Sequence, residues 1–292
     1  MKQLEKFILN CALLEQAPTL DSLKNSALSG NRIYYGTGLA TPRAMSVGLP
    51  VDVLGMMLLG ERISEICEFP QFVHHIADTH AKTNSFADPE EVDRLAQETK
   101  RTLGMVSKNL GIKRIKIVMS SEIDTTPDYQ AFYKKFRGES KLHEYVVNEL
   151  CDIAWYKKHM NIETKLGWVI QGSETSIGSD ERLFDREYVR ITKEQHLFLY
   201  AKAGRTFDAS RPKASPYIIT EGEHRLPLRA GISVQEILDE NIKRTGDKDL
   251  MGATKHLQSI VRLYEEHAKE RFGNIPLHEK LQKIIDKAFL NV

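Results

Sequence analysis

The chain has 292 residues, of which 41% are hydrophobic and 28% are charged, so its composition is that of a folded globular protein rather than a disordered or fibrous one. A chain of this length can bury a hydrophobic core without disulfides or bound metals, and its length corresponds to about two domains of ~150 residues. The 41 basic and 40 acidic residues give a net charge of +1, which argues against binding nucleic acid through bulk charge. Three cysteines without CxxC spacing exclude a disulfide scaffold and a zinc module.

The first 110 residues alternate between helical and β-prone patterns. Residues 3–15 carry apolar side chains at helical spacing, and residues 32–36 form a β-prone run that ends at a glycine. A loop of small residues then separates this strand from a helical pattern over 49–63. Residues 72–78 predict a second strand. Residues 89–110 predict a helix, because a proline and two acids open it and apolar side chains follow at helical spacing.

The alternation continues towards the C-terminus. Residues 114–121 predict a third strand, and about 128–160 form a long helical region. Two more β-prone runs, 165–172 and 196–204, predict a fourth and a fifth strand. From residue 233 the pattern is helical to the end, with breaks expected at Gly246, Gly252, Gly273 and Pro276.

Strands separated by helices predict an α/β fold with a Rossmann-like parallel sheet and helices on both faces. Because the predicted strands stop near residue 225, we expect a Rossmann-like catalytic domain over 1–225 and a C-terminal helical region over 226–292. The most apolar window, residues 51–59, is much shorter than the ~20 residues that a membrane span needs. The charged N-terminal residues also lack the apolar core of a signal peptide, so we expect a soluble, cytoplasmic protein.

Small and charged residues follow the predicted strands, and ligands of a parallel α/β sheet bind at the carboxyl ends of its strands. Gly36 and Gly38 follow the first strand, but the third glycine of a GxGxxG dinucleotide motif is out of place. Asp78 ends the second strand. The third and fifth strands precede a set that includes candidate phosphate ligands: Ser120, Ser121, Glu122, Arg205, Asp208, Arg211, Lys213 and Ser215. On charge alone, the loop after the fifth predicted strand is equally well interpreted as a solvated surface turn.

Two further groups of residues suggest binding sites. Tyr145, Glu149 and Asp152 are spaced i, i+4 and i+7, so on a helix they share one face. A phenol and two carboxylates suit an ammonium group, although one buried tyrosine beside two exposed acids is the alternative. The histidines and aspartate at 74, 75, 78 and 80 are better interpreted as a structural histidine pair than as metal ligands, so we expect no metal site.

These segments resemble, in their order, the catalytic domain of class I aminoacyl-tRNA synthetases, and in particular the short archaeal-type tyrosyl-tRNA synthetases. Over about residues 33–240, IADTHAKTN resembles the family's ADLHA strand end and SSEI its later Ser-Glu strand end. The Tyr145 helix resembles the family's Tyr-x3-Gln-x2-Asp motif, and Asp180-Glu181-Arg182 its Asp/Glu-Gln-Arg. The segment RPKASPYI falls where the mobile Lys-Met-Ser-Lys-Ser loop is expected.

The resemblance implies an enzyme that activates an amino acid with ATP, for transfer to tRNA or to a small-molecule acceptor. The amino-acid carboxylate attacks the α-phosphate and yields an aminoacyl-adenylate and pyrophosphate. ATP is the implied co-substrate, Mg²⁺ is an ion that could accompany it, and a homodimer is the implied assembly. The implied roles are catalysis by Lys213, Ser215, Ser46 and Arg43, nucleotide binding by Gly36, Gly38, Gly48 and Arg211, and amino-acid binding by Tyr145, Glu149, Asp152, Asp78 and Glu181.

The sequence departs from the family's pattern at several of these motifs. The His-x-Gly-His signature aligns with Ser46–Leu49 and keeps only its glycine, and Pro216 and Tyr217 replace the second Lys and Ser of the mobile loop. Glutamates replace glutamines at 149 and 181, which favours a polar or cationic amino acid. Residues 233–292 contain 10 basic and 10 acidic residues, so charge does not support tRNA binding by this region.

Two alternatives stay open. The first is an enzyme that consumes aminoacyl-tRNA without ATP, as cyclodipeptide synthases do. Tyr145-x3-Glu149 fits their catalytic pair, but Thr37 stands where their nucleophilic serine is expected. The second is a synthetase-like binding protein without activity.

Overall fold

The computed structural model describes residues 32–37, 49–82, 88–139, 144–160, 162–165, 227–228, 231–245 and 251–291, together with residues 3, 6 and 7. Residues 3, 6 and 7 are helical, as the periodicity of 3–15 predicts, and the rest of that segment lies outside the described residues.

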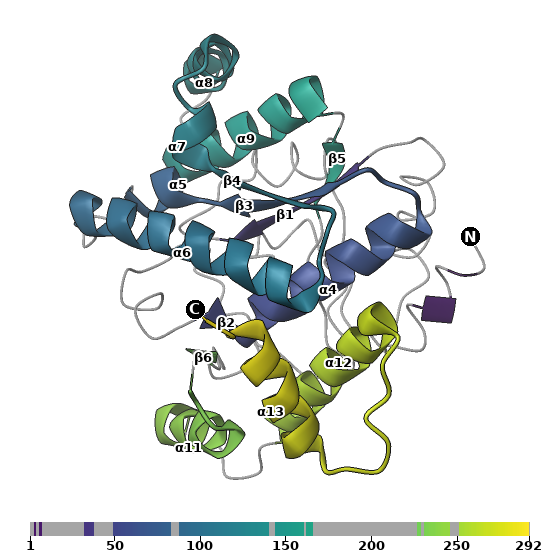
Figure 1. Cartoon of the computed structure of the whole chain (residues 1–292). Coiled ribbons are helices and arrows are strands. Elements are labelled where there is room, and N and C mark those ends of the chain that lie inside the picture. The colour runs from purple at the N-terminus through teal and green to yellow at the C-terminus, as the bar shows by residue number, and fades with distance from the viewer. Residues whose placement is uncertain are drawn as a thin grey trace.

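The centre of the fold is a sheet of four parallel strands in the order β4-β3-β1-β5 (Figure 1). The strands β1 (Arg32–Thr37), β3 (Phe72–Ile76) and β4 (Ile115–Met119) confirm the first three predicted strands. The fourth, β5 (Ile162–Lys165), ends where the predicted strand at 165–172 begins. Its polar sequence IETK gives little hydrophobic signal, and the remainder of 165–172 and all of 196–204 lie outside the described residues.

Helices pack on both faces of this sheet (Figure 1). Consecutive strand residues point to opposite faces, so Phe72 and Ile76 of β3 join one hydrophobic core and Val73 joins the other. The helices α4 and α6 cover the first face, and α8 and α9 cover the second. Their bounds are α4 (Val51–Ile66), α6 (Pro89–Leu110), α8 (Pro127–Glu139) and α9 (Glu144–Met160).

Local sequence sets the ends of these helices. The side chain of Asp88 accepts a hydrogen bond from the Glu90 backbone N–H at 3.0 Å, Pro89 opens α6, and Gly111 ends it with φ of 74°. The predicted helix at 49–63 begins two residues later than expected, because Leu49–Pro50 (β2) pairs with Pro227–Leu228 (β6). The single helical region expected over 128–160 is two helices, since α8 ends at Glu139, next to a helix-weakening glycine.

Three helices follow in the C-terminal region: α11 (Val234–Thr245), α12 (Met251–Ala268) and α13 (Leu277–Ala288). Gly273 lies between α12 and α13 with φ of 67°, and Pro276 caps α13, as expected. The break expected at Gly252 is wrong, because this residue lies in the first turn of α12, where backbone N–H groups lack intrahelical partners anyway. Gly246 lies outside the described residues.

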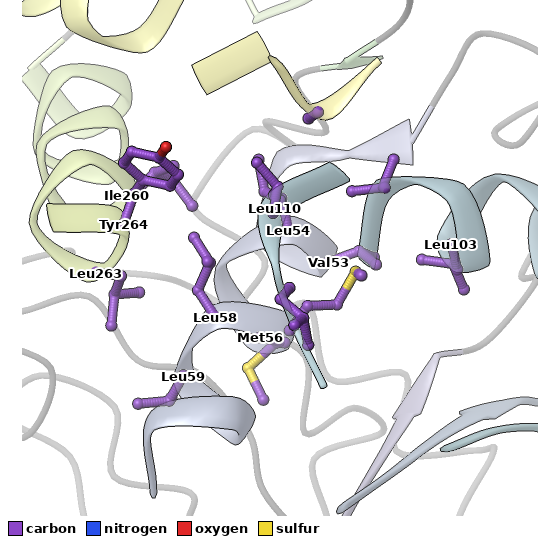
Figure 2. Packing of buried hydrophobic residues seen from close by; sticks show 14 of the residues in the cluster. Val53, Leu54, Met56, Leu58, Leu59, Leu103, Leu110, Ile260, Leu263 and Tyr264 are labelled. Atoms are coloured by element: carbon purple, nitrogen blue, oxygen red, sulfur yellow. The ribbon is translucent and has the colours of Figure 1, made fainter. Parts of the chain in front are cut away.

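The C-terminal helices share their core with the sheet-covering helices. Buried side chains of α4, α6, α12 and α13 form one cluster, and Figure 2 shows Leu54, Leu110 and Tyr264 among those that meet there. The predicted domain boundary near residue 225 lies outside the described residues and stays a prediction. Among the helices that are described, none has the length and apolarity to cross a membrane.

Candidate functional site

The strand order reverses at β1, which has β3 on one side and β5 on the other. In open parallel sheets, ligands bind outside the carboxyl ends of the strands near such a reversal. At this edge, the short helices α5 (Asp78–Lys82) and α7 (Ser120–Ile123) begin directly after β3 and β4. Their first residues therefore lie where a ligand of this sheet is expected.

Hydrogen bonds tie α5 to α7. The Asp78 side chain is fully buried, and its Oδ1 accepts a hydrogen bond from the Ser121 backbone N–H at 3.1 Å. The Thr79 hydroxyl donates to Oδ2 of Asp124 at 2.8 Å. The two strand ends that the sequence singled out, 76–84 and 120–123, thus meet through direct contacts.

A buried polar network lies under this edge, on the sheet face that α9 covers. Nε2 of His75 lies 3.0 Å from Oδ2 of Asp152 and 2.9 Å from Oγ of Ser120. Nδ1 of His75 lies 2.7 Å from the Tyr156 hydroxyl, and the Tyr129 hydroxyl donates to Oδ1 of Asp152 at 3.1 Å. All five side chains are buried. We call these five residues the His75 network.

The phenols of the His75 network keep their protons. Burial and the negative charge of Asp152 raise the pKa of Tyr156 and of Tyr129 well above the usual range. A protonated Tyr156 donates to Nδ1 of His75, so we assign the imidazole proton to Nε2, which faces Asp152. Oδ1 of Asp152 therefore accepts a hydrogen bond from a phenol O–H, and its Oδ2 lies 3.0 Å from Nε2 of His75.

Negative charge accumulates at the same edge. Burial raises the pKa of Asp124, and the carboxylates of Asp78 and Asp152 raise it further, against the hydrogen bond from Thr79 and the charge of Lys82. Asp124 thus lies close enough to Asp78 and to Asp152 for its charge to interact with each of theirs, and we call these three residues the carboxylate cluster. Such a cluster favours a cationic group in its vicinity.

Comparison with known proteins places this geometry in a wider context. Neither a protein-family model nor a curated protein matches the sequence. Among solved structures, tyrosyl-tRNA synthetase from Aeropyrum pernix is 16% identical, with 98% of this chain and 93% of that chain covered and a TM-score of 0.55. Tryptophanyl-tRNA synthetase from Plasmodium falciparum is 14% identical, with 98% and 84% covered and a TM-score of 0.50. The chain has a class I synthetase-like fold. At this level of identity, the likeness concerns the fold alone.

Within the synthetase-like fold, some of the predicted site residues come together. Asp78 and Asp152 both belong to the carboxylate cluster. Gly36 in β1 is in register with His75 of β3, so the start of the predicted nucleotide loop lies beside the His75 network. Tyr145 and Glu149 lie on α9 together with Asp152, but their side chains lie outside the described part of the structure. The same holds for all atoms of Gly38, Arg43, Ser46, Gly48, Glu181, Arg211, Lys213 and Ser215.

The synthetase-like fold also corrects one prediction and adds residues that sequence reasoning missed. His74 and His75 are not a pair, because they point to opposite faces of β3. Burial, together with the charge of His75, lowers the pKa of His74 to about 3. Tyr129 and Tyr156 were missed. The i, i+4 spacing of Asp152 and Tyr156 on one helix was the only signal for the second of them.

Two other observations concern candidate ligands at this edge. Glu122, which follows β4, is exposed, and its carboxylate is occupied by Lys100 and by the backbone N–H of Met119. The described residues contain no group of three His, Cys, Asp or Glu side chains that could hold a metal ion.

Proposed function

We propose that this protein is an enzyme of class I synthetase type that activates an amino acid with ATP. Two observations support the proposal: the synthetase-like fold around a parallel sheet of Rossmann-like order, and the location of Asp78 and Asp152 near the same carboxylate, Asp124. The second carries the most weight. These two residues belong to separate motifs of the resemblance, and both lie at the carboxyl edge of the sheet, where the amino-acid pocket is expected.

The reaction requires positioning more than covalent chemistry. Tyr145 and Glu149 would hold the α-ammonium group of the amino acid, with Asp78, Asp152 and Glu181 around it. The amino-acid carboxylate attacks the α-phosphorus of ATP, the bond to the bridging oxygen breaks, and pyrophosphate leaves with the electron pair. Alignment of the two substrates and stabilisation of the developing charge account for the catalysis.

The phosphate side of the site consists of residues proposed from the resemblance. Gly36, Gly38, Gly48 and Arg211 would bind the nucleotide, and Lys213, Ser215, Ser46 and Arg43 would stabilise the transferring phosphate. The location of Gly36 beside His75 supports this, because a nucleotide loop that begins there adjoins the carboxylate cluster. The acceptor is tRNA or a small molecule, and a homodimer is the proposed assembly. Residues 1–225 would form the catalytic domain, and residues 226–292 would form the C-terminal helical region.

Amino-acid-dependent exchange of labelled pyrophosphate into ATP tests the proposal. The assay uses the full chain with proteinogenic and cationic amino acids, each with and without tRNA. We expect exchange with one amino acid or a small group of them. The Asp78→Asn variant should lose at least ~10-fold in exchange, which corresponds to about 1.4 kcal/mol of transition-state stabilisation.

Asp128→Asn is the matched control, because Asp128 is a partly exposed carboxylate that binds Lys158 and His159, and it should exchange like the parent. Absence of exchange with every amino acid, in the presence and absence of tRNA, contradicts the proposed function.

A further inference from the structure

A carboxylate oxygen of Asp78 at the sheet edge has no hydrogen-bond partner among the described residues. Oδ1 of Asp78 accepts the hydrogen bond from Ser121, but Oδ2 is buried and accepts none from any described residue. A buried charged oxygen without a hydrogen bond costs several kcal/mol, so natural structures rarely keep one without a reason. A ligand that donates to this oxygen would supply what the described side chains do not.

The other members of the carboxylate cluster are already engaged. Both oxygens of Asp152 face donors, one at His75 and one at Tyr129. Oδ2 of Asp124 accepts from Thr79. Asp78 is therefore the member that can accept a new donor, and Asp152 is the member that is held in place.

The surroundings of Asp78 favour a cation over a neutral donor. Asp78 and Asp152 both place negative charge near Asp124, and the cationic side chain that acts on this group among the described residues is Lys82. Lys82 is bound by Asp93 at 2.5 Å, so its charge is largely balanced elsewhere. Asp124 is only partly buried, which gives the cluster a side towards solvent.

We propose that Asp78, with Asp124 beside it, binds the cationic side chain of a basic amino acid. This rests on the proposed function, in which Tyr145 and Glu149 take the α-ammonium group and leave Asp78 for a second cation. The substrate class is then an amino acid with a side-chain ammonium or guanidinium group. A neutral analogue would leave the charge of Asp78 uncompensated, so discrimination of at least ~10-fold is expected.

Calorimetric titration of the full chain without ATP tests this inference. The probes are two matched pairs: L-lysine with L-norleucine, and L-arginine with L-citrulline. The second member of each pair keeps the α-ammonium group but lacks the side-chain charge: L-norleucine lacks the terminal ammonium group, and L-citrulline carries a neutral urea in place of the guanidinium group. We expect one cationic member to bind at least ~10-fold tighter than its neutral partner, and Asp78→Asn to remove that difference. Asp124→Asn should reduce it, and Asp128→Asn should leave it unchanged.

A stability measurement guards against a variant that simply fails to fold. In Asp78→Asn the amide oxygen still accepts from Ser121 and the unpaired charge is gone, so this variant should melt at or above the temperature of the parent. Three results overturn the inference: equal affinity for both members of both pairs, unchanged preference in Asp78→Asn, or a clear loss of stability in that variant. The last would show that the carboxylate is already satisfied in the ligand-free protein.

The two proposals fail in different ways. Pyrophosphate exchange with neutral amino acids alone overturns the cation site and leaves adenylation standing. Binding of L-lysine or L-arginine that depends on Asp78, without exchange, supports the site and contradicts adenylation.

Discussion

The Asp152→Asn substitution tests whether the carboxylate of Asp152 stabilises the fold or only contacts the substrate. Asp152 is 1% exposed, and its Oδ2 lies 3.0 Å from Nε2 of His75. In the variant, the amide oxygen can still accept from Tyr129, but the amide NH₂ then faces the imidazole N–H. The change thus removes the negative charge that lies 3.0 Å from Nε2 of His75 and sets two donors against each other. We expect a loss of stability with little rearrangement.

The magnitude follows from that contact. A buried donor that is left without an acceptor costs about 1–3 kcal/mol, and the lost attraction between the carboxylate and the imidazole N–H adds to this, so we expect about 2–3 kcal/mol. In a chain of this size, 1 kcal/mol shifts Tm by roughly 2–4 °C, which gives a decrease of about 4–12 °C. Asp78→Asn, in contrast, should lose binding and keep its stability.

Urea and thermal unfolding followed by circular dichroism measure these quantities. The single variants Asp152→Asn and His75→Gln and their double variant form a double-mutant cycle, for which we expect a coupling of about 1 kcal/mol or more. Tyr129→Phe should couple more weakly to Asp152→Asn, because the hydroxyl keeps an acceptor in that variant. Additive effects of the first two changes, or a loss below about 0.5 kcal/mol, would refute the structural role of Asp152.

Two further predictions concern the opposite face of the sheet. A Cβ on Gly60 would lie 2.6 Å from Cε2 of Phe72, so Gly60→Ala should lose about 1–3 kcal/mol despite its better helix propensity. A Cβ on Gly104 would have no neighbouring atom within 4 Å, so Gly104→Ala should raise the free energy of unfolding by up to ~1 kcal/mol. Equal shifts of Tm in both variants would contradict the close packing at Gly60. His74, with its pKa lowered to about 3, binds a proton in the unfolded chain below about pH 6.5 but not in the folded one. The free energy of unfolding should therefore fall by about 1.4 kcal/mol per pH unit as the pH decreases towards 4. The urea midpoint of His74→Met should fall less steeply with pH than that of the parent, and parallel curves for the two proteins would contradict this prediction.

Local signals determined much of the fold. The helix α6 could be predicted to the residue, because Asp88, Pro89 and Gly111 fix its ends through their own backbone and side-chain preferences. The first three strands are apolar or β-branched runs that end at turn-forming residues, which is why periodicity alone located them. The strand β5 escaped prediction because its polar residues owe their extended conformation to pairing with β1.

The candidate site divides in the same way. The sequence by itself placed Asp78 at a strand end and Asp152 on a helix face, since both positions follow from local spacing. It carried no information on their common location near Asp124, because that depends on how α9 packs on the sheet. Only the tertiary structure decided that His75 and Tyr129 contact the carboxylate of Asp152. It also decided that Oδ2 of Asp78 has no hydrogen-bond partner among the described residues. The physical reason is that periodicity encodes which way a side chain points, whereas the partner that it meets is set by packing between distant segments.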